Sequence, residues 1–217
     1  MTITPDSVKA LLESEDFGDR LRAVNQMRQL DPAIAFDLIQ IAATDPSVRV
    51  RYAAVSQVSS LGSQNPDLAL ALLQTSLRDP EPDVQAAAAD SIGALQLTTA
   101  FEDLQALYHH SSEWLVQFSI IAALGELGDP TSFDLLQEAL GSDNELVRTA
   151  ALGSLGELGD PRAIPLLTSY ATHPDWQIRH RVVQALGHFQ TPEARAVLEN
   201  MVGDENSTVA QEAKLYL

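Results

Sequence analysis

The 217-residue chain contains no cysteine. Disulfides, thiolate zinc sites and a cysteine nucleophile are therefore excluded, and a reducing compartment is expected. Aromatic residues are also scarce, at 6% of a chain that is 45% hydrophobic and rich in alanine and leucine. This composition is typical of helices that pack closely through small side chains.

Long apolar runs are missing. The longest, such as residues 120–124, fall far short of the roughly 20 residues that a membrane-spanning helix needs. The opening residues 1–6 have neither the basic region nor the apolar block of a signal peptide. We therefore expect a soluble, cytoplasmic protein without membrane insertion.

Positive charge is in short supply, with 13 Lys and Arg against 30 Asp and Glu and a net charge of −17. A general nucleic-acid binder needs a basic surface to displace counterions from phosphates. The charge balance thus argues against nucleic acid as a partner.

What the chain does have is an internal repeat. The phrase ELVRTAALGSLGELGDP at residues 145–161 is preceded by LVQFSIIAALGELGDP at 115–130 and followed by QIRHRVVQALGHFQTP at 177–192, in steps of about 31 residues. Self-similarity at such a period indicates a solenoid. Aligning all copies on one position, which we call the anchor, gives Asp19, Val50, Val84, Val116, Val147, Ile178 and Val209.

Each copy predicts two helices. Apolar residues recur 0, 4, 8 and 11 positions along the copies, as on one face of a helix, and this is the second helix of the repeat. The exceptions are Asp19 at the first anchor and the last copy, which reaches only position 8 at Leu217. The first helices are expected at residues 7–14, 32–43, 68–77, 100–110, 132–140, 163–171 and 193–201, several of them with Pro at the first position. The fold class is therefore an all-α, HEAT-type α-solenoid, curved into a right-handed superhelix. It forms a single domain, 1–217, with seven repeats at approximately 5–31, 32–62, 65–96, 98–128, 129–159, 160–190 and 191–217.

Charge is segregated between the helices. The second helices carry eight basic and five acidic residues, so the excess of acids lies elsewhere. Second helices that line a concave surface would make it neutral to basic, and solenoids bind partners on such surfaces. Arg51, Arg148 and Arg179 each follow an anchor directly. They either bind a ligand or, as we prefer, pair with turn acids of neighbouring repeats as a structural ladder.

Positions opposite the buried stripe supply the candidate binding residues. They lie two, three, six, nine and ten residues after an anchor, where exposed aromatic and basic groups are typical contacts. The candidates for partner or bilin binding on the concave face are Arg22, Asn25, Arg28, Tyr52, Ser56, Phe118, His180, Arg181, Gln184 and His188. Glycine recurs nine residues after four anchors (Gly93, Gly125, Gly156, Gly187), which indicates either close helix approach or room for a partner.

Local motifs do not indicate catalysis or a metal. The histidines lack the spacing of a helical metal pair, and no phosphate loop or nucleophile elbow occurs. Trp114 and Trp176 occupy equivalent turn positions, which favours shared packing over ligand stacking. Catalytic residues remain unassigned, and the oligomeric state is open.

The phrases DPSVRVRYAAV at 45–55, DNELVRTAALG at 143–153 and LGDP at 127–130 resemble the phycobilisome-lyase HEAT-like repeat family. The opening half, with EDFGDRLRAV at 15–24 and QLDP at 29–32, is most similar to members that act in phycobilisome degradation in cyanobacteria.

This resemblance implies binding of phycobiliproteins, phycocyanin or allophycocyanin, at the phycobilisome on the thylakoid surface during stress, with assistance in bilin detachment. It implies no required cofactor, only a transient phycocyanobilin ligand. Two alternatives stay open. One is an enzyme, a bilin lyase acting on phycocyanobilin at antenna cysteines, and the other is a generic HEAT-repeat scaffold for protein-protein interaction.

Overall fold

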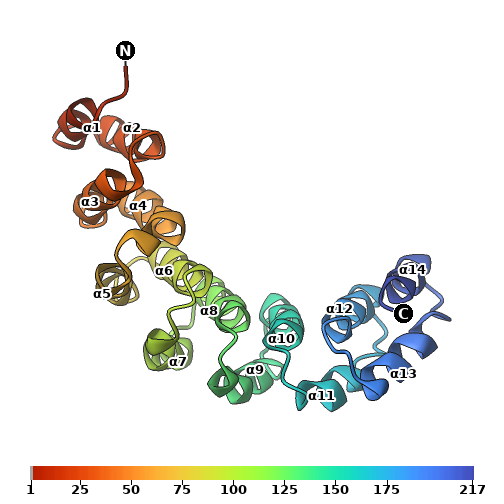
Figure 1. The fold of residues 1–217 in the computed structure, drawn as a ribbon. Helices are drawn as coiled ribbons and strands as arrows, with labels where there is room; N and C mark the ends of the chain where they lie inside the picture. Colours follow the sequence, from red (N-terminus) through yellow and green to blue (C-terminus); the bar gives the residue numbers. More distant parts are fainter. Residues whose placement is uncertain (1) are drawn as a thin grey trace. The chain divides into compact units, whose positions relative to one another are not determined.

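A computed structural model describes residues 2–217. This part of the chain folds into fourteen α-helices and three 3-10 helices, without a strand (Figure 1). The chain divides into two compact units, one ending at Ala123 and the other beginning at Leu124. The all-helical repeat fold expected from the sequence is confirmed, whereas the superhelical curvature and the single domain stay predictions.

Every predicted repeat interval holds one pair of α-helices. The first helices are α1 (Pro5–Leu12), α3 (Pro32–Ala42), α5 (Pro66–Ser76), α7 (Phe101–His110), α9 (Phe133–Ala139), α11 (Ala163–Ser169) and α13 (Pro192–Met201). The second helices are α2 (Phe17–Met27), α4 (Val48–Leu61), α6 (Pro82–Ala94), α8 (Trp114–Leu127), α10 (Glu145–Leu158), α12 (Trp176–Leu186) and α14 (Ser207–Leu215). The 3-10 helices are η1 (Gly62–Gln64), η2 (Thr98–Ala100) and η3 (Pro130–Ser132).

Short polar side chains start these helices and glycine ends some of them. Asp31 accepts a hydrogen bond from the Ala33 N–H at 3.0 Å, and Pro32 follows as the first residue of α3. This arrangement satisfies one of the free N–H groups at the start of a helix. At the end of α10, Gly159 has φ +69°, a left-handed conformation that glycine adopts without steric cost.

Within each unit the second helices form one layer. In the first unit α2 packs on α4 and α4 on α6, and in the second unit α10 packs on α12 and α12 on α14 (Figure 1). The anchors Val50, Val84, Val116, Val147 and Val209 are all fully buried. Their burial is why the 31-residue period can be seen in the sequence.

The second helices bury more than the stripe that the period predicts. The residues five positions after the anchors are also buried, namely Val24, Val55, Ala89, Ile121, Leu152 and Val183. Two hydrogen bonds reach this position from the next second helix, Gln57 Nε2 to Val24 O at 2.9 Å and Ser91 Oγ to Val55 O at 3.0 Å. The additional face is therefore the contact between successive repeats.

Close approach accounts for three of the four recurring glycines. A Cβ on Gly125 would lie 2.8 Å from Ser154 Cα, and one on Gly156 would lie 2.5 Å from Ala185 Cα. A Cβ on Gly187 would collide with the ring of Tyr216. The expectation that residues nine positions after the anchors are exposed is wrong here, because these positions face the next second helix.

Across residues 2–217, no helix combines the length and the apolar character that crossing a bilayer requires.

Candidate partner-binding surface

Three arginines connect neighbouring repeats through bidentate ion pairs, which we call the inter-repeat ladder. Arg20, Arg51 and Arg179 each follow an anchor and donate from Nε and Nη2 to one aspartate of the next repeat. The Nε to Oδ2 distance is 2.7 Å in each pair, Arg20 with Asp45, Arg51 with Asp79 and Arg179 with Asp204. Parallel N–H bonds of this kind are the strong form of an arginine–carboxylate pair.

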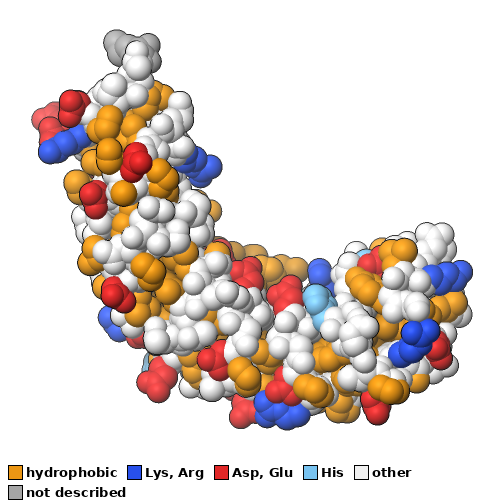
Figure 2. All heavy atoms as spheres, viewed as in Figure 1, with side chains coloured by type: hydrophobic (Ala, Val, Ile, Leu, Met, Phe, Trp, Pro, Cys, Tyr) orange, Lys and Arg blue, Asp and Glu red, His pale blue; other side chains and the backbone are white. Residues whose placement is uncertain are grey.

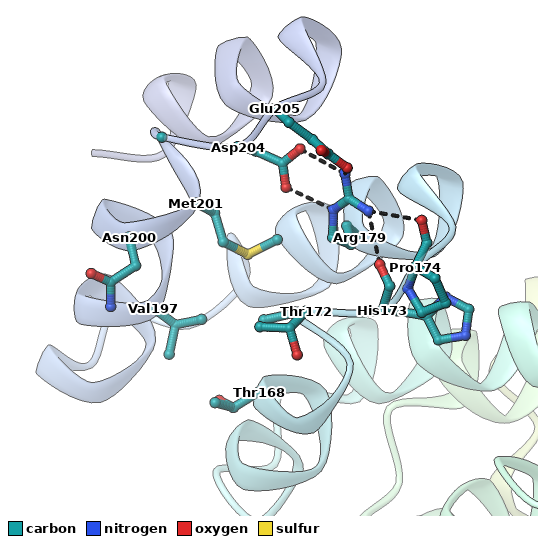
Figure 3. Close-up of a pocket in the computed structure, with 12 residues that line it drawn as sticks. Thr168, Thr172, His173, Pro174, Arg179, Val197, Asn200, Met201, Asp204 and Glu205 are labelled. Atoms are coloured by element: carbon teal, nitrogen blue, oxygen red, sulfur yellow. Dashed lines mark hydrogen bonds and ion pairs between the residues drawn. The ribbon is translucent and has the colours of Figure 1, made fainter.

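The pair between Arg179 and Asp204 is the most enclosed of the three. Its side chains are 7% and 8% exposed. Figure 3 shows the guanidinium between Asp204, Glu205 and the carbonyls of His173 and Pro174. Hydrogen bonding from Arg179 holds the pKa of Asp204 below its usual range, and the same bond raises the pKa of Arg179.

A second contact of the same side chains stays within the repeat. Arg179 Nη1 donates to the carbonyl of His173, six residues earlier, at 2.8 Å. Arg20, Arg51 and Arg148 donate to the carbonyl six residues earlier as well, and Gln85 and Gln117 do so from Nε2. Six repeats thus satisfy a carbonyl of the turn before the second helix in the same way.

Arg148 does not join the ladder, which corrects the expectation from the sequence. It makes the within-repeat bond to Ser142 O at 2.6 Å but has no acidic partner among the described residues. The reason is that the position filled by Asp45, Asp79 and Asp204 elsewhere holds His173 in the next repeat. Arg20 was not predicted as a member of the ladder, although it directly follows its anchor as Arg51 and Arg179 do.

In the first unit the candidate binding residues lie on three second helices. Arg22 and Asn25 of α2 and Arg28, the residue after that helix, are exposed, and Arg22 Nη2 lies 3.1 Å from Asp19 Oδ1. Arg22 also lines a cavity of about 570 Å³ between α1 and α2. On α4, Tyr52 is 48% exposed and its carbonyl accepts a hydrogen bond from the Ser56 hydroxyl.

Phe118 of α8 is less available than expected, since it is half-buried. It lies two residues after its anchor, where the sequence pattern predicts exposure. Its neighbour Ser119 is buried and hydrogen-bonds the carboxylate of Asp90 on α6. Desolvation raises the pKa of Asp90 although the side chain keeps contact with solvent, and the Ser119 hydroxyl opposes that shift.

In the second unit the candidates belong to α12, except His188, which lies just after that helix. Arg181 and His188 are exposed, and Arg181 Nη1 donates to Gln184 Oε1 at 3.3 Å. His180 is half-buried, with Nε2 3.8 Å from Glu212 Oε2. Arg181 thus keeps its positive charge facing solvent without an acidic partner among the described residues.

A hollow of about 330 Å³ is lined by two of these candidates together with Trp176, which the sequence assigned to packing. It lies between the first turns of α10 and α12 and is lined by Leu146, Trp176, His180 and Arg181, with Glu145 and Asp175 among its other residues. Leu146 is 51% exposed and Trp176 is 41% exposed. The rings of Trp176 and His180 lie edge to face, with their centroids 6.4 Å apart. We call these four residues the α10–α12 site.

The chemistry of the α10–α12 site suits recognition. It presents an apolar side chain, an indole and a guanidinium that can stack on or pair with a ligand carboxylate. Trp and Arg in such a setting are typical binding hot spots. Exposure of both Trp176 and Trp114, which is 46% exposed, disagrees with the expected packing role and follows from their place at the first residues of α12 and α8.

On the face drawn in Figure 2, Asp and Glu are spread among apolar and uncharged groups, and Lys and Arg occur in separate places. Among residues 2–217, no three His, Asp or Glu side chains gather as a metal site requires.

A larger cavity of about 520 Å³ lies beside the ladder in the second unit (Figure 3). Thr168, Thr172, Val197 and Met201 line it, and Arg179 with Asp204 closes one side. Because this guanidinium is already fully paired, the cavity offers no free guanidinium to a ligand.

Comparison with known families identifies the repeat. Residues 69–156 and 135–217 match the family model for HEAT repeats, which together covers well over half of the chain. The chain belongs to the HEAT-repeat family. None of the curated proteins matches this HEAT-repeat protein significantly in sequence.

Solved structures share the fold at low sequence identity. The complex of CpcE and CpcF of phycocyanin lyase from Nostoc sp. PCC7120 is similar with a TM-score of 0.65 and 20% identity, covering 100% of this chain and 96% of that one. The Escherichia coli protein YibA has a TM-score of 0.69 and 17% identity, with 97% and 80% coverage. The archaeal HEAT-like repeats protein from Thermococcus onnurineus has a TM-score of 0.59 and 15% identity, with 100% and 96% coverage.

Proposed function

We propose that this HEAT-repeat protein binds phycobiliproteins, phycocyanin or allophycocyanin, through the exposed surface of its second helices. Its role would be in phycobilisome degradation at the thylakoid surface, where it assists the detachment of bilins, as the resemblance of its opening half to the degradation protein NblB suggests. The observation that carries the proposal is the α10–α12 site, where Leu146, Trp176 and Arg181 are exposed together around one hollow.

Three further points support this proposal. HEAT solenoids bind protein partners on extended helical surfaces. The similarity in fold to a structure named as a complex of phycocyanin lyase extends over the whole chain, which favours phycocyanin as a partner. Bilin propionates are carboxylates, and an arginine without an acidic partner, such as Arg181, suits them.

A second candidate function is catalytic, favoured by the same likeness to a lyase complex. In that case the protein would itself remove or attach phycocyanobilin at an antenna cysteine. The two functions differ in turnover, because a binding module forms a stoichiometric complex and leaves the thioether bond of the bilin intact.

The test mixes purified protein with holo-phycocyanin and follows complex formation by size-exclusion chromatography and bilin attachment by visible absorbance. A complex with unchanged chromophore supports the binding module, and loss of bilin over many turnovers supports the lyase. Absence of any complex with phycocyanin or allophycocyanin would refute the proposal.

Matched variants locate the surface. Trp176→Ala combined with Arg181→Glu should weaken the complex at least tenfold, and Arg22→Glu tests the surface of the first unit in the same way. Arg195→Glu on α13 is the control, because Arg195 is 59% exposed but lies on a first helix and pairs with Glu199 of the same helix. Equal losses in the control and the site variant would contradict the assignment.

A further inference from the structure

Four arginines directly follow an anchor, and Arg148 differs from the other three in having no aspartate partner within residues 2–217. In three of them Nε and Nη2 are occupied by an aspartate of the next repeat, at 2.7 Å from Nε. Arg148 is anchored in the same manner through Nη1 to Ser142 O, yet the Nε and Nη2 edge has no acceptor among the described residues. Its guanidinium is therefore held in position with its carboxylate-binding edge unused.

The residue in the place of the aspartate cannot serve as that acceptor. His173 Nδ1 accepts the N–H of Asp175 at 3.1 Å, just as Asp204 Oδ1 accepts the N–H of Asn206 at 2.8 Å. A carboxylate has a second oxygen left for the arginine Nε, as Asp204 Oδ2 shows. An imidazole whose Nδ1 accepts carries its proton on Nε2 and has only this donor left.

Arg148 and His173 therefore both offer hydrogen-bond donors, whereas the equivalent pair in the ladder combines an arginine donor with an aspartate acceptor. Arg148 and His173 are both half-buried, so solvent reaches them. Burial also limits the movement of the arginine, which lowers the entropy cost of fixing it in an ion pair. The missing component is an anion with two oxygens in one plane.

We propose that Arg148 is a binding site for the carboxylate of an aspartate carried by a partner polypeptide. The occupants of the equivalent positions define the ligand, since Asp45, Asp79 and Asp204 all come from a turn that precedes a second helix. A partner's turn of the same type would complete the set. The proposal does not depend on the identity of the partner and stands apart from the α10–α12 site.

The test uses the full-length protein and a blocked peptide with one carboxylate. Acetyl-Asp-Pro-Ser-Val-amide reproduces the turn at residues 45–48, which occupies Arg20 within this chain. The Nε resonances of the arginines are followed by NMR during titration, which detects weak complexes. Acetate in a parallel titration distinguishes a peptide ligand from any small carboxylate.

We expect the Arg148 Nε resonance to move and saturate with the Asp peptide. The matched Asn peptide, acetyl-Asn-Pro-Ser-Val-amide, lacks the carboxylate and should give less than a tenth of that shift. His173→Asp should move the Arg148 resonance to the range of Arg20, Arg51 and Arg179 and weaken peptide binding at least tenfold, because an internal carboxylate fills the site. This variant keeps the proposal testable without removing the arginine.

The controls separate the site from general charge effects. Arg195→Gln, at an exposed arginine of α13, should leave the titration unchanged. Equal shifts with the Asp and Asn peptides, or an unchanged response in His173→Asp, would overturn the proposal. An acetate response as strong as that of the peptide would overturn the polypeptide ligand.

Discussion

Removing the carboxylate of Asp204 tests how much the inter-repeat ladder stabilises the second unit. Asp204→Asn preserves the shape of the side chain but leaves Arg179, 7% exposed, without its bidentate partner. Breaking one side of an enclosed ion pair costs about 3–5 kcal/mol, since a charge is left without compensation. Glu205, 3.3 Å from Nη2, and the two turn carbonyls still compensate in part. We therefore expect a loss of about 3 kcal/mol, at the lower end of that range.

The measurement is urea unfolding followed by circular dichroism, with hydrogen exchange of α12 and α14 to assign the loss to the second unit. For a chain of this size, 3 kcal/mol corresponds to a fall in Tm of roughly 6–12 °C. Glu199→Gln, in the exposed pair with Arg195, is the control and should change stability by less than about 0.5 kcal/mol.

The pH dependence gives an independent check. The pKa of Asp204 is lower in the folded protein than in the unfolded chain, so its contribution is present above the unfolded value and disappears as the pH falls through the folded value. Acidification should therefore narrow the difference in stability between wild type and Asp204→Asn. A difference below about 0.5 kcal/mol at pH 7 would refute the claim that the ladder is stabilising.

Two further predictions concern the second-helix layer. Gly156→Ala should destabilise the protein by about 1–3 kcal/mol, because the added Cβ would lie 2.5 Å from Ala185 Cα. Gly153→Ala should stabilise it by up to about 1 kcal/mol, because the nearest neighbour of its Cβ would be 3.6 Å away. Thermal melts of both variants test this pair of predictions. Asp90→Asn should stabilise the protein at pH 7, because the raised pKa of Asp90 means that folding disfavours the charged carboxylate. This gain in stability should disappear as the pH falls through the folded and then the unfolded pKa of Asp90. Melts from pH 3 to 7 in which the gain does not change with pH would contradict the prediction.

The repeats and most of the core could be predicted from the sequence because the anchors recur in steps of 31 to 34 residues. Val147 and four other anchors are fully buried, so the recurring apolar positions report them. Val55 and Leu152 face another repeat, and no local period distinguishes that face from solvent. The same limit explains why Gly156 was expected at the surface.

The candidate site was predictable only in part. Arg181 follows from its place opposite the buried stripe, and the structure does show it exposed. The exposure of Leu146 and Trp176 depends on how the first turns of two neighbouring helices leave a hollow, which sequence spacing does not specify. The lack of an aspartate partner for Arg148 could be predicted only by aligning the turns of successive repeats. It depends on His173, 25 residues later, which takes the place of that aspartate.

The bond from each second helix back to its own turn has a consequence for how such arrays change length. Arg20, Arg51, Gln85, Gln117, Arg148 and Arg179 all satisfy a carbonyl of their own repeat. Duplication or deletion of a whole repeat leaves none of these carbonyls without its donor. Where glutamine replaces arginine, the turn is closed without any demand on the following copy. The middle copies are therefore the ones at which a repeat could be gained or lost most easily, in evolution or by engineering.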